Sequence, residues 1–533
     1  MNSKYLFELL RRTAPAGMPP SQRRRTVLRI AAALAASAVT PVASLRTWAQ
    51  PRFSDYPFTL GVASGCPRPD GVVLWTRLAP EPLAGGGMPQ ENVELAWELA
   101  ADEGFRDIVR TGTATATPDL GHSVHVELTD LEPARWYWYR FTAGDAVSPA
   151  GRTRTAPAPD AAVERLRFAF ASCQQYEQGF YAAHRHLAAE DLDLIVFLGD
   201  YIYESSWGRN HVRKHATFEP YTLADYRTRH AQYKTDPDLQ RSHAAAPWLV
   251  TWDDHEVDND YADDRSEDLD PDFLARRAAA YQAYYEHMPL ARRSLPHGPG
   301  VRIYDRFAFG DLVQFHVLDD RQYRSHQACP RLDRGGSNVV ADCAERLASG
   351  RTMLGTAQET WLREGFARTR AKWNVIAQQT LMAQLDRKPG RDQSFWTDGW
   401  DGYPAARARL LDDIARLKPS NPLAIGGDVH CNWVADLKPD FDDPKSPVVA
   451  TEFCGTSITS QGPSTKQVLA WLAENPHLRY GNGARRGYVT MEIRPAACTA
   501  TLRALDSEKR ADSGIYALAT FVVENGRPGA QRA

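Results

Sequence analysis

Long apolar runs, internal repeats and an excess of one charge are all missing from this chain. Its 63 Lys and Arg residues nearly balance its 66 Asp and Glu residues, which leaves a formal net charge of −3. A nucleic-acid surface needs a clustered basic excess, so this balance argues against such a partner. Beyond the N-terminal segment, no stretch approaches the roughly 20 apolar residues of a membrane-spanning helix. With 533 residues, the chain is long enough for two or more domains.

Cysteine is scarce, with seven residues in the whole chain. In an oxidising compartment most of them should pair, and the odd count leaves at least one thiol free. Cys329 and Cys343 flank a polar, glycine-containing loop and are the best candidates for a disulfide. Cys173 is the expected free thiol, because it follows an apolar strand at a point where a metal ligand is wanted.

The first 49 residues have the pattern of an export signal. Arg23 to Arg25 precede a short, alanine-rich apolar stretch, and Thr47-Trp48-Ala49 is a plausible cleavage site. A basic amphipathic membrane helix is the alternative. We expect residues 1–49 to be a twin-arginine signal peptide that engages the twin-arginine export machinery. The mature protein would then be periplasmic or secreted, with no permanent membrane span.

Two patterns of secondary structure divide the rest of the chain. Residues 50–157 contain short apolar strands separated by turn residues. The spacing of Leu, Pro, Tyr and Arg at 131–140 resembles the tyrosine-corner strand of fibronectin type III domains, in which a tyrosine hydroxyl bonds to upstream backbone. From 165 to 525, apolar strands alternate with helical stretches such as 273–287. We therefore expect an all-β sandwich followed by an α/β domain.

Four apolar segments of the α/β region end in side chains that can bind metal. These side chains are Cys173 after FAFAS, Asp200 and Tyr203 around LIVFLGDYIY, Asp253, Asp254 and His255 after WLVTW, and Asp428 and His430 after LAIGG. Any one ending could simply cap the next helix, but four together are hard to explain by chance. The carboxyl ends of parallel strands meet at one edge of a sheet, so these side chains should converge.

The types of ligand indicate two kinds of metal ion. Thiolate and phenolate favour a trivalent ion such as iron(III), and aspartates favour a hard divalent ion such as calcium. Two neighbouring ions can hold a phosphate, activate water and neutralise a leaving group. His255, beside Asp254, is placed to give a proton to that leaving group or to bind a phosphate oxygen. In contrast, His184, His186 and His230 lie in charged helical stretches and are predicted to be surface residues.

The order of these motifs resembles the calcineurin-like, purple-acid-phosphatase-like metallophosphoesterases, and within them the alkaline phosphatase D (PhoD) family. Residues 199–203 fit the motif GDxxY, 253–256 take the place of GNH(D/E), and 427–430 take the place of GHxH. Cys173 stands in the region of the DxH motif. Near the N-terminus, GVASGCP followed by LWTR resembles the family's GVASGDP…LWTR signature, with Cys66 in place of Asp.

The resemblance implies a four-layer α/β/β/α metallophosphoesterase sandwich, over residues 165–525, with an Fe(III) and Ca site. The implied iron ligands are Cys173, Asp200, Tyr203 and His430, and the implied calcium ligands are Asp200, Asp254 (or Asp253) and Asp428. Asn259 and Gln379 are candidates for a further calcium ligand. Arg321 lies in an element that resembles the family's LDxRxYR. It could bind phosphate, and a structural salt bridge is an equal alternative.

The resulting hypothesis is an exported alkaline phosphatase that hydrolyses phosphate esters by in-line attack of a metal-bound hydroxide. A phosphodiesterase or phospholipase D-type hydrolase of the same family, acting on lipid or polymer phosphodiesters, stays open because specificity lies in pocket walls. An exported binding protein with a purely structural metal site is the alternative from another class. His255 argues against it, because a structural site has no need of a proton donor.

Overall fold

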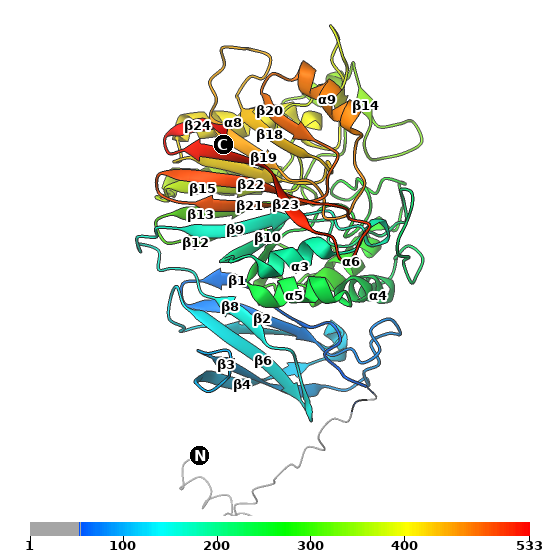
Figure 1. Ribbon diagram of the computed structural model, residues 1–533. Helices are drawn as coiled ribbons and strands as arrows, with labels where there is room; N and C mark the ends of the chain where they lie inside the picture. The colour runs from blue at the N-terminus through cyan, green and yellow to red at the C-terminus, as the bar shows by residue number, and fades with distance from the viewer. Residues whose placement is uncertain (1–52, 54) are drawn as a thin grey trace, which may run out of the picture. The chain divides into compact units, whose positions relative to one another are not determined.

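Two large β-sheets form the core of the computed structural model, which describes residue 53 and residues 55–533 (Figure 1). The first sheet consists, from edge to edge, of β24 (Arg527–Arg532), β23 (Ile515–Glu524), β22 (Ala497–Leu505), β21 (Gly487–Ile493), β9 (Leu166–Ala171), β10 (Leu194–Phe197), β11 (Trp248–Val250), β1 (Val62–Arg68), β2 (Gly71–Arg77) and β5 (Ser123–Leu128). The predicted signal peptide, residues 1–49, lies outside the described residues. None of the described helices has both the length and the hydrophobicity to cross a bilayer.

The second sheet has its own central set of parallel strands. It consists of β12 (Asp305–Phe309), β13 (Val313–Val317), β15 (Trp373–Ala377), β17 (Pro422–Gly426), β19 (Ala450–Cys454), β18 (Asn432–Leu437) and β20 (Leu478–Asn482). In the first sheet, Phe197 of β10 pairs with both Ala171 of β9 and Val250 of β11, all parallel. These three strands therefore end at the same level, and the residues that follow them share one edge.

Alternate residues of each strand face different layers. Phe168 and Phe170 of β9 point toward the second sheet, where the Phe168 ring meets the Phe315 ring edge-on at 5.1 Å. Ala169 and Ala171 point the other way, into a core shared with helices. Strands buried on both faces read as continuous apolar runs, and the sequence shows this pattern.

Helices cover the outer face of each sheet. The first sheet packs against α3 (Ala182–Ala189), α4 (Leu223–Lys234), α5 (Pro237–Ala245) and α6 (Phe273–His287). The second packs against α7 (Gly355–Arg368), α8 (Pro404–Leu417) and α9 (Thr465–Glu474). A short ladder joins β14 (Val339–Val340) to β16 (Phe395–Trp396) beside the second sheet. The α/β/β/α architecture is confirmed, and α6 begins and ends at the predicted residues.

The N-terminal strands form a smaller sandwich that shares a sheet with the rest of the fold. Its separate sheet contains β3 (Val93–Ala100), β4 (Ile108–Ala116), β6 (Trp136–Ala143), β7 (Ala146–Val147) and β8 (Gly151–Arg154). Facing it are β1, β2 and β5, which continue the first large sheet because Gly65 of β1 pairs with Trp248 of β11. The backbone N–H of Glu132 donates to the Tyr137 hydroxyl at 3.1 Å, which confirms the tyrosine corner. The domain boundaries at 157 and 165 stay a prediction.

Cysteine pairing differs from the expectation. Cys329 and Cys343 form the predicted disulfide, with their Cα atoms 6.2 Å apart. The other five cysteines are free, and four of these are buried, so the prediction that most would pair is wrong. Cys498, for example, packs between the two sheets, where a thiol behaves as a small apolar side chain. Cys173 is free, as predicted.

The prediction that three histidines lie on the surface is wrong for two of them. His184 is fully buried, and its ring nitrogens contact Gln174 Oε1 at 2.7 Å and Ser242 Oγ at 2.9 Å. His230 is also buried and stacks on His287. His186 is half-buried. The polar residues around these histidines in the sequence misled the prediction, because α3 buries His184 against β10 and β11, and α4 buries His230 against α6.

Lys234, at the end of α4, is buried with no carboxylate in contact among the described residues. Its Nζ lies 3.4 Å from His243 Nε2 and 4.3 Å from the centroid of the Trp75 ring. Burial lowers the pKa of Lys234 from 10.5 to about 7. Between these two values the unfolded chain binds more protons than the folded one, so stability rises with pH there. Below about pH 7 the full cost of the buried charge is present.

We expect Lys234→Met to raise the free energy of unfolding near pH 7 by on the order of 2 kcal/mol, because it removes this cost. The gain should shrink toward zero near pH 10.5, where the unfolded lysine is also losing its charge. Denaturant titrations at both pH values measure the difference. Lys372→Met, at a half-exposed lysine paired with Asp311, is the matched control and should show no such gain. A pH-independent effect of Lys234→Met would contradict the assignment.

Candidate metal centre

The residues that leave the strand ends share an uncommon backbone conformation. Cys173, Asp200, Asp428 and His430 have φ values of 60°, 54°, 63° and 53°. Positive φ is rare for residues other than glycine, and such residues cluster at functional sites. Each turn redirects the chain directly after a strand. The side chains are thereby brought to the same edge of the two sheets.

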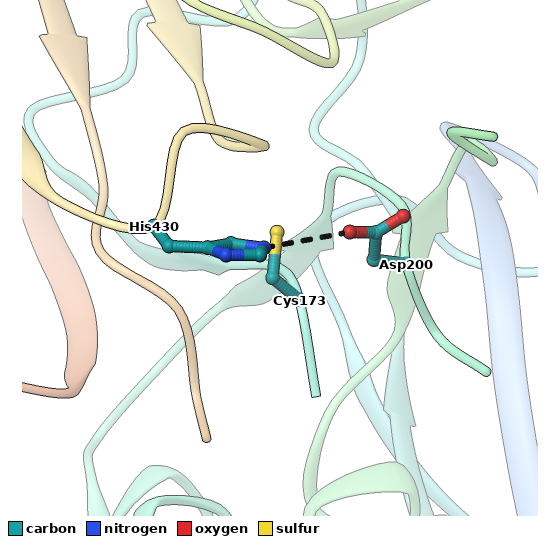
Figure 2. Close-up of side chains that lie close together, drawn as sticks. All are labelled: Cys173, Asp200 and His430. Carbon is teal, nitrogen blue, oxygen red and sulfur yellow. Dashed lines mark ion pairs between the residues drawn. The ribbon is translucent and has the colours of Figure 1, made fainter. Parts of the chain in front are cut away.

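Cys173, Asp200 and His430 form the first ligand group (Figure 2). Their donor atoms lie within 4.8 Å of one another, and His430 Nε2 is 3.8 Å from Asp200 Oδ2. The Tyr203 hydroxyl donates to Asp200 Oδ2 at 2.6 Å and lies 3.1 Å from His430 Nε2. The structure therefore brings together all four residues predicted to bind iron.

Two neighbours orient this group, and sequence reasoning missed both. The backbone carbonyl of Gln461 lies 2.6 Å from His430 Nδ1, so this nitrogen carries the proton and Nε2 is left as the acceptor. Such outer partners are typical of metal-binding histidines. Ser460 Oγ donates to the Tyr203 hydroxyl at 2.8 Å. Both residues lie in the loop after β19, which carries no metal-ligand motif.

Asp253, Asp254 and Asp428 form a second group, whose donor oxygens also lie within 4.8 Å of one another. Asp254 belongs to a third group with Asp200 and His255. Asp200 Oδ1 and Asp253 Oδ2 are buried and have no hydrogen-bond partner among the described residues. Buried carboxylate oxygens without donors are costly unless a cation is present. The donor set of this centre therefore fits bound metal ions.

The electrostatics of the carboxylates support the same conclusion. Burial raises the pKa of Asp428 to about 7, and repulsion from Asp254 adds to the rise while Arg321 opposes it. Burial also raises the pKa of Asp253 well above its usual range. The Cys173 thiol behaves in the same way, because of burial and the nearby Asp200. A bound cation would offset all of these rises, since it favours the charged form of each group.

Arg321 is a buried cation inside this cluster. It is 0% exposed, and its guanidinium donates to Asp253 through Nε and to Asp398 through Nη1. Its Nη2 lies 3.8 Å from Asp254 Oδ1 and 3.7 Å from Asp428 Oδ1. Burial alone would raise the pKa of Asp254, but Arg321 and His255 hold it well below its usual range. This burial favours the salt-bridge alternative for Arg321 over contact with phosphate.

His255 is held by a carboxylate that sequence reasoning missed. Its Nδ1 lies 2.7 Å from Glu204 Oε2, and its ring centroid lies 4.1 Å from that of Tyr203. Burial alone would lower the pKa of His255, but Glu204 and Asp254 raise it well above the usual value. Glu204 directly follows Tyr203 in the sequence, and this adjacency was the available signal.

Asn259 and Gln379, the two candidates for a further calcium ligand, differ in whether the side-chain amide oxygen is free to bind a cation. Asn259 borders the cavity, and its amide nitrogen donates to Glu267 at 2.7 Å, which leaves the amide oxygen for a cation. The Gln379 amide nitrogen donates to Thr251 Oγ1 and to backbone carbonyls, and its oxygen accepts from a backbone N–H at 3.2 Å. Asn259 is therefore the better candidate.

A cavity of about 630 Å³ opens directly onto these groups. Asp200, Asp254, His255, Asp428 and His430 line it on one side. The lining also contains further carboxylates, four tryptophans and two arginines; the tryptophans and arginines are Trp207, Trp396, Trp433, Trp471, Arg334 and Arg387. The volume is within the range of sites for small molecules. Carboxylates, a thiol and imidazoles at the strand ends of an α/β/β/α sandwich define a phosphoric ester hydrolase of the metallophosphoesterase type.

Comparison with family models agrees with this class. The model described as PhoD-like phosphatase matches residues 168–502, and its N-terminal-domain model matches residues 42–157. The chain therefore belongs to the PhoD-like phosphatase family.

Two known proteins are similar to the chain over most of its length. Alkaline phosphatase D of Bacillus subtilis (strain 168) is 47% identical over 500 residues, which cover 91% of this chain and 84% of that protein. A solved structure, described as the structure of PhoD, superposes with a TM-score of 0.87 at 46% identity. That match covers 91% of this chain and 93% of the solved one.

Gly199 precedes Asp200 and is needed for its position. It has a φ of +106°, and a Cβ added there would lie 2.5 Å from the backbone nitrogen of Asp253. We expect Gly199→Ala to separate Asp200 from Asp253, and to lower both the bound metal and the turnover at least about tenfold. Metal analysis and a phosphatase assay on the same sample measure both effects.

Gly526→Ala is the matched control for this variant. Gly526 also has positive φ, at +77°, but a Cβ there meets nothing within 4 Å. It should lose only about 1 kcal/mol of stability and keep its metal. Full metal content and turnover in Gly199→Ala would show that the close approach does not set the site.

Proposed function

We propose that this phosphatase hydrolyses phosphate esters in the 630 Å³ cavity with Fe(III) and Ca as its ions. The convergence of a thiol, a phenol, an imidazole and several carboxylates at one sheet edge carries this proposal. Anionic sulfur and phenol ligands suit a trivalent iron, and carboxylates suit calcium. When bound, the ions would supply charge to polarise the phosphate and to lower the pKa of water.

The chain's own residues divide into two ligand sets. Cys173, Asp200, Tyr203 and His430 would hold the iron. Asp200 would be shared, and the calcium set would add Asp254, Asp428, Asn259 and the unpartnered oxygen of Asp253. Arg321 would hold Asp253 in place beneath this set. It acts as a positioning residue in this proposal, because it does not reach the cavity.

His255 is the proposed proton donor. Because Glu204 engages its Nδ1, Nε2 is the ring nitrogen left for the substrate. His255 lines the cavity beside Asp254, where an ester oxygen would lie. It would hold its proton on Nε2 and pass it to the oxygen of the departing alcohol. Glu204 would keep the ring oriented and stabilise its charged form.

Export by the twin-arginine route to the periplasm or the medium is part of the same proposal. The consecutive arginines Arg23 to Arg25 and the alanine-rich stretch that follows them support it. The disulfide between Cys329 and Cys343 also supports it, because such bonds persist in oxidising compartments.

Asp200→Ala tests the shared ligand. Because Asp200 belongs to two of the ligand groups, its loss should abolish metal retention and turnover together. Metal analysis and hydrolysis of p-nitrophenyl phosphate on one preparation measure both. A metal-free variant that still turns over substrate would contradict the proposed site.

Tyr203→Phe tests the identity of the first ion. A tyrosinate bound to iron(III) absorbs visible light, so the purified protein should be coloured and this variant should lose the band. Tyr201→Phe is the matched control, because the Tyr201 hydroxyl bonds to His243 and lies outside the ligand groups. A band that survives Tyr203→Phe but not Tyr201→Phe would contradict the assignment.

The two alternative functions are separable. Family membership and the open cavity beside His255 favour a hydrolase over a binding protein with a structural metal site. The ratio of turnover for p-nitrophenyl phosphate against bis-p-nitrophenyl phosphate, with calcium present, separates a monoesterase from a diesterase. A ratio well above one supports the phosphatase, and a ratio well below one supports the diesterase.

A further inference from the structure

Arg387 is a cation without a counter-ion in the cavity wall. Among the described residues, its guanidinium forms no salt bridge and donates no hydrogen bond, and its Nε is buried. Burial lowers the pKa of Arg387 from its ordinary value, and Asp401, Cys431 and Asp428 oppose this without forming a salt bridge to it. Arg334, the other arginine of the cavity, is paired with Glu267 at 2.7 Å and Asp268 at 3.4 Å. The two arginines therefore differ in what they can offer a ligand.

Two indoles lie against the Arg387 guanidinium. Its Cζ lies 5.0 Å from the ring centroid of Trp396 and 5.2 Å from that of Trp471. Contacts of this kind attract the cation to the ring faces and do not use its N–H groups as hydrogen-bond donors. The fork of N–H groups on a guanidinium matches an oxyanion. The partner that fits this position is thus an anion.

Hydrogen bonds hold the backbone on both sides of Arg387 in place. Arg387 N–H donates to Ser394 O at 2.9 Å, and Trp471 Nε1 donates to Arg387 O at 3.2 Å. Asp386 exchanges two backbone hydrogen bonds with the Asn475 amide, both at 2.9 Å. An unpaired arginine on a mobile loop would not define a binding site. Here the loop is tied to α9, so the guanidinium is held in place before any ligand arrives.

The position of Arg387 in the cavity indicates which part of a substrate it would meet. Arg387, Trp396 and Trp471 line the same cavity as Asp428 and His430. The ligand groups would take the phosphate that reacts, so an anion at Arg387 belongs to the rest of the molecule. We propose that Arg387, Trp396 and Trp471 form a subsite for a second oxyanion, a carboxylate or a phosphate, on the leaving group of the substrate. This inference rests on the proposed function and names its substrate class.

Three aryl esters test the subsite. Phenyl phosphate carries no second anion, whereas 3-carboxyphenyl phosphate and 1,3-phenylene bisphosphate each carry one. The wild-type protein should show a lower KM for at least one of the two anionic esters. Arg387→Gln should raise that KM about tenfold, as expected for loss of a charge-assisted hydrogen bond, and change the KM of phenyl phosphate less than about twofold. Arg387→Lys should keep part of the preference, because it retains the charge without the fork.

Arg334→Gln is the matched control. It should leave the ratio of the KM of phenyl phosphate to the KM of each anionic ester unchanged, because Glu267 and Asp268 already neutralise Arg334. A response to one anionic ester alone identifies the oxyanion, and either response supports the subsite. Equal KM values in the wild type, or an equal change for all three esters in Arg387→Gln, would overturn it.

A binding measurement separates failure of the subsite from failure of the proposed function. Phenylphosphonate and 3-carboxyphenylphosphonate cannot be hydrolysed, so calorimetry reports their affinity whether or not the protein turns over esters. The carboxylated ligand should bind the wild type about tenfold more tightly, and Arg387→Gln should remove that difference. Absence of turnover with this preference intact would refute the proposed function alone. Absence of the preference with turnover intact would refute the subsite alone.

Discussion

The contact between one buried guanidinium and the aspartates around it is the interaction on which the centre depends. Arg321 pairs with Asp253 and Asp398 and lies near Asp254 and Asp428. Without this charge, the largely buried carboxylates would repel one another with little screening by solvent. One arginine cannot neutralise all of them, and the pKa values of Asp253 and Asp428 remain raised. The protein thus supplies enough positive charge to hold the ligands together. The remaining negative charge of the aspartates is available to bind cations.

Much of the fold could be predicted because local and global signals agree. Double-sided burial makes strands such as β10 and β11 read as unbroken apolar runs, and each ends at a glycine or a polar residue. Parallel strands that end level must present their next residues at one edge, so the approach of Cys173 to Asp200 was predictable from chain order alone. Asp428 follows β17 of the second sheet, and its approach depends on how the two sheets pack. The tyrosine corner was likewise readable from the spacing of its own residues.

Contacts between distant segments were beyond the reach of the sequence. Asp398 carries no motif, and its role appears only when Arg321 is brought beside it. Glu204 follows Tyr203 in the chain, but its contact with His255 appears only in the fold. The same applies to the buried histidines, since a polar neighbourhood in the chain does not reveal which helix face meets the sheet. The prediction that most cysteines would pair was wrong for a related reason. Thiols such as Cys498 are enclosed in packed core and find no second cysteine there, so an expectation based on the compartment alone does not apply to them.

The sharing of one sheet by both ends of the described chain has a consequence for folding. Strand β1 comes from residues 62–68 and β24 from residues 527–532, yet both belong to the sheet that carries Asp200. That sheet is complete only when almost the whole chain is available, and contacts of such long range form slowly. Until β21 has paired with it, β9 presents an open edge that other chains can join. A partly synthesised chain of this topology is therefore open to strand addition by other chains until its C-terminal strands have paired.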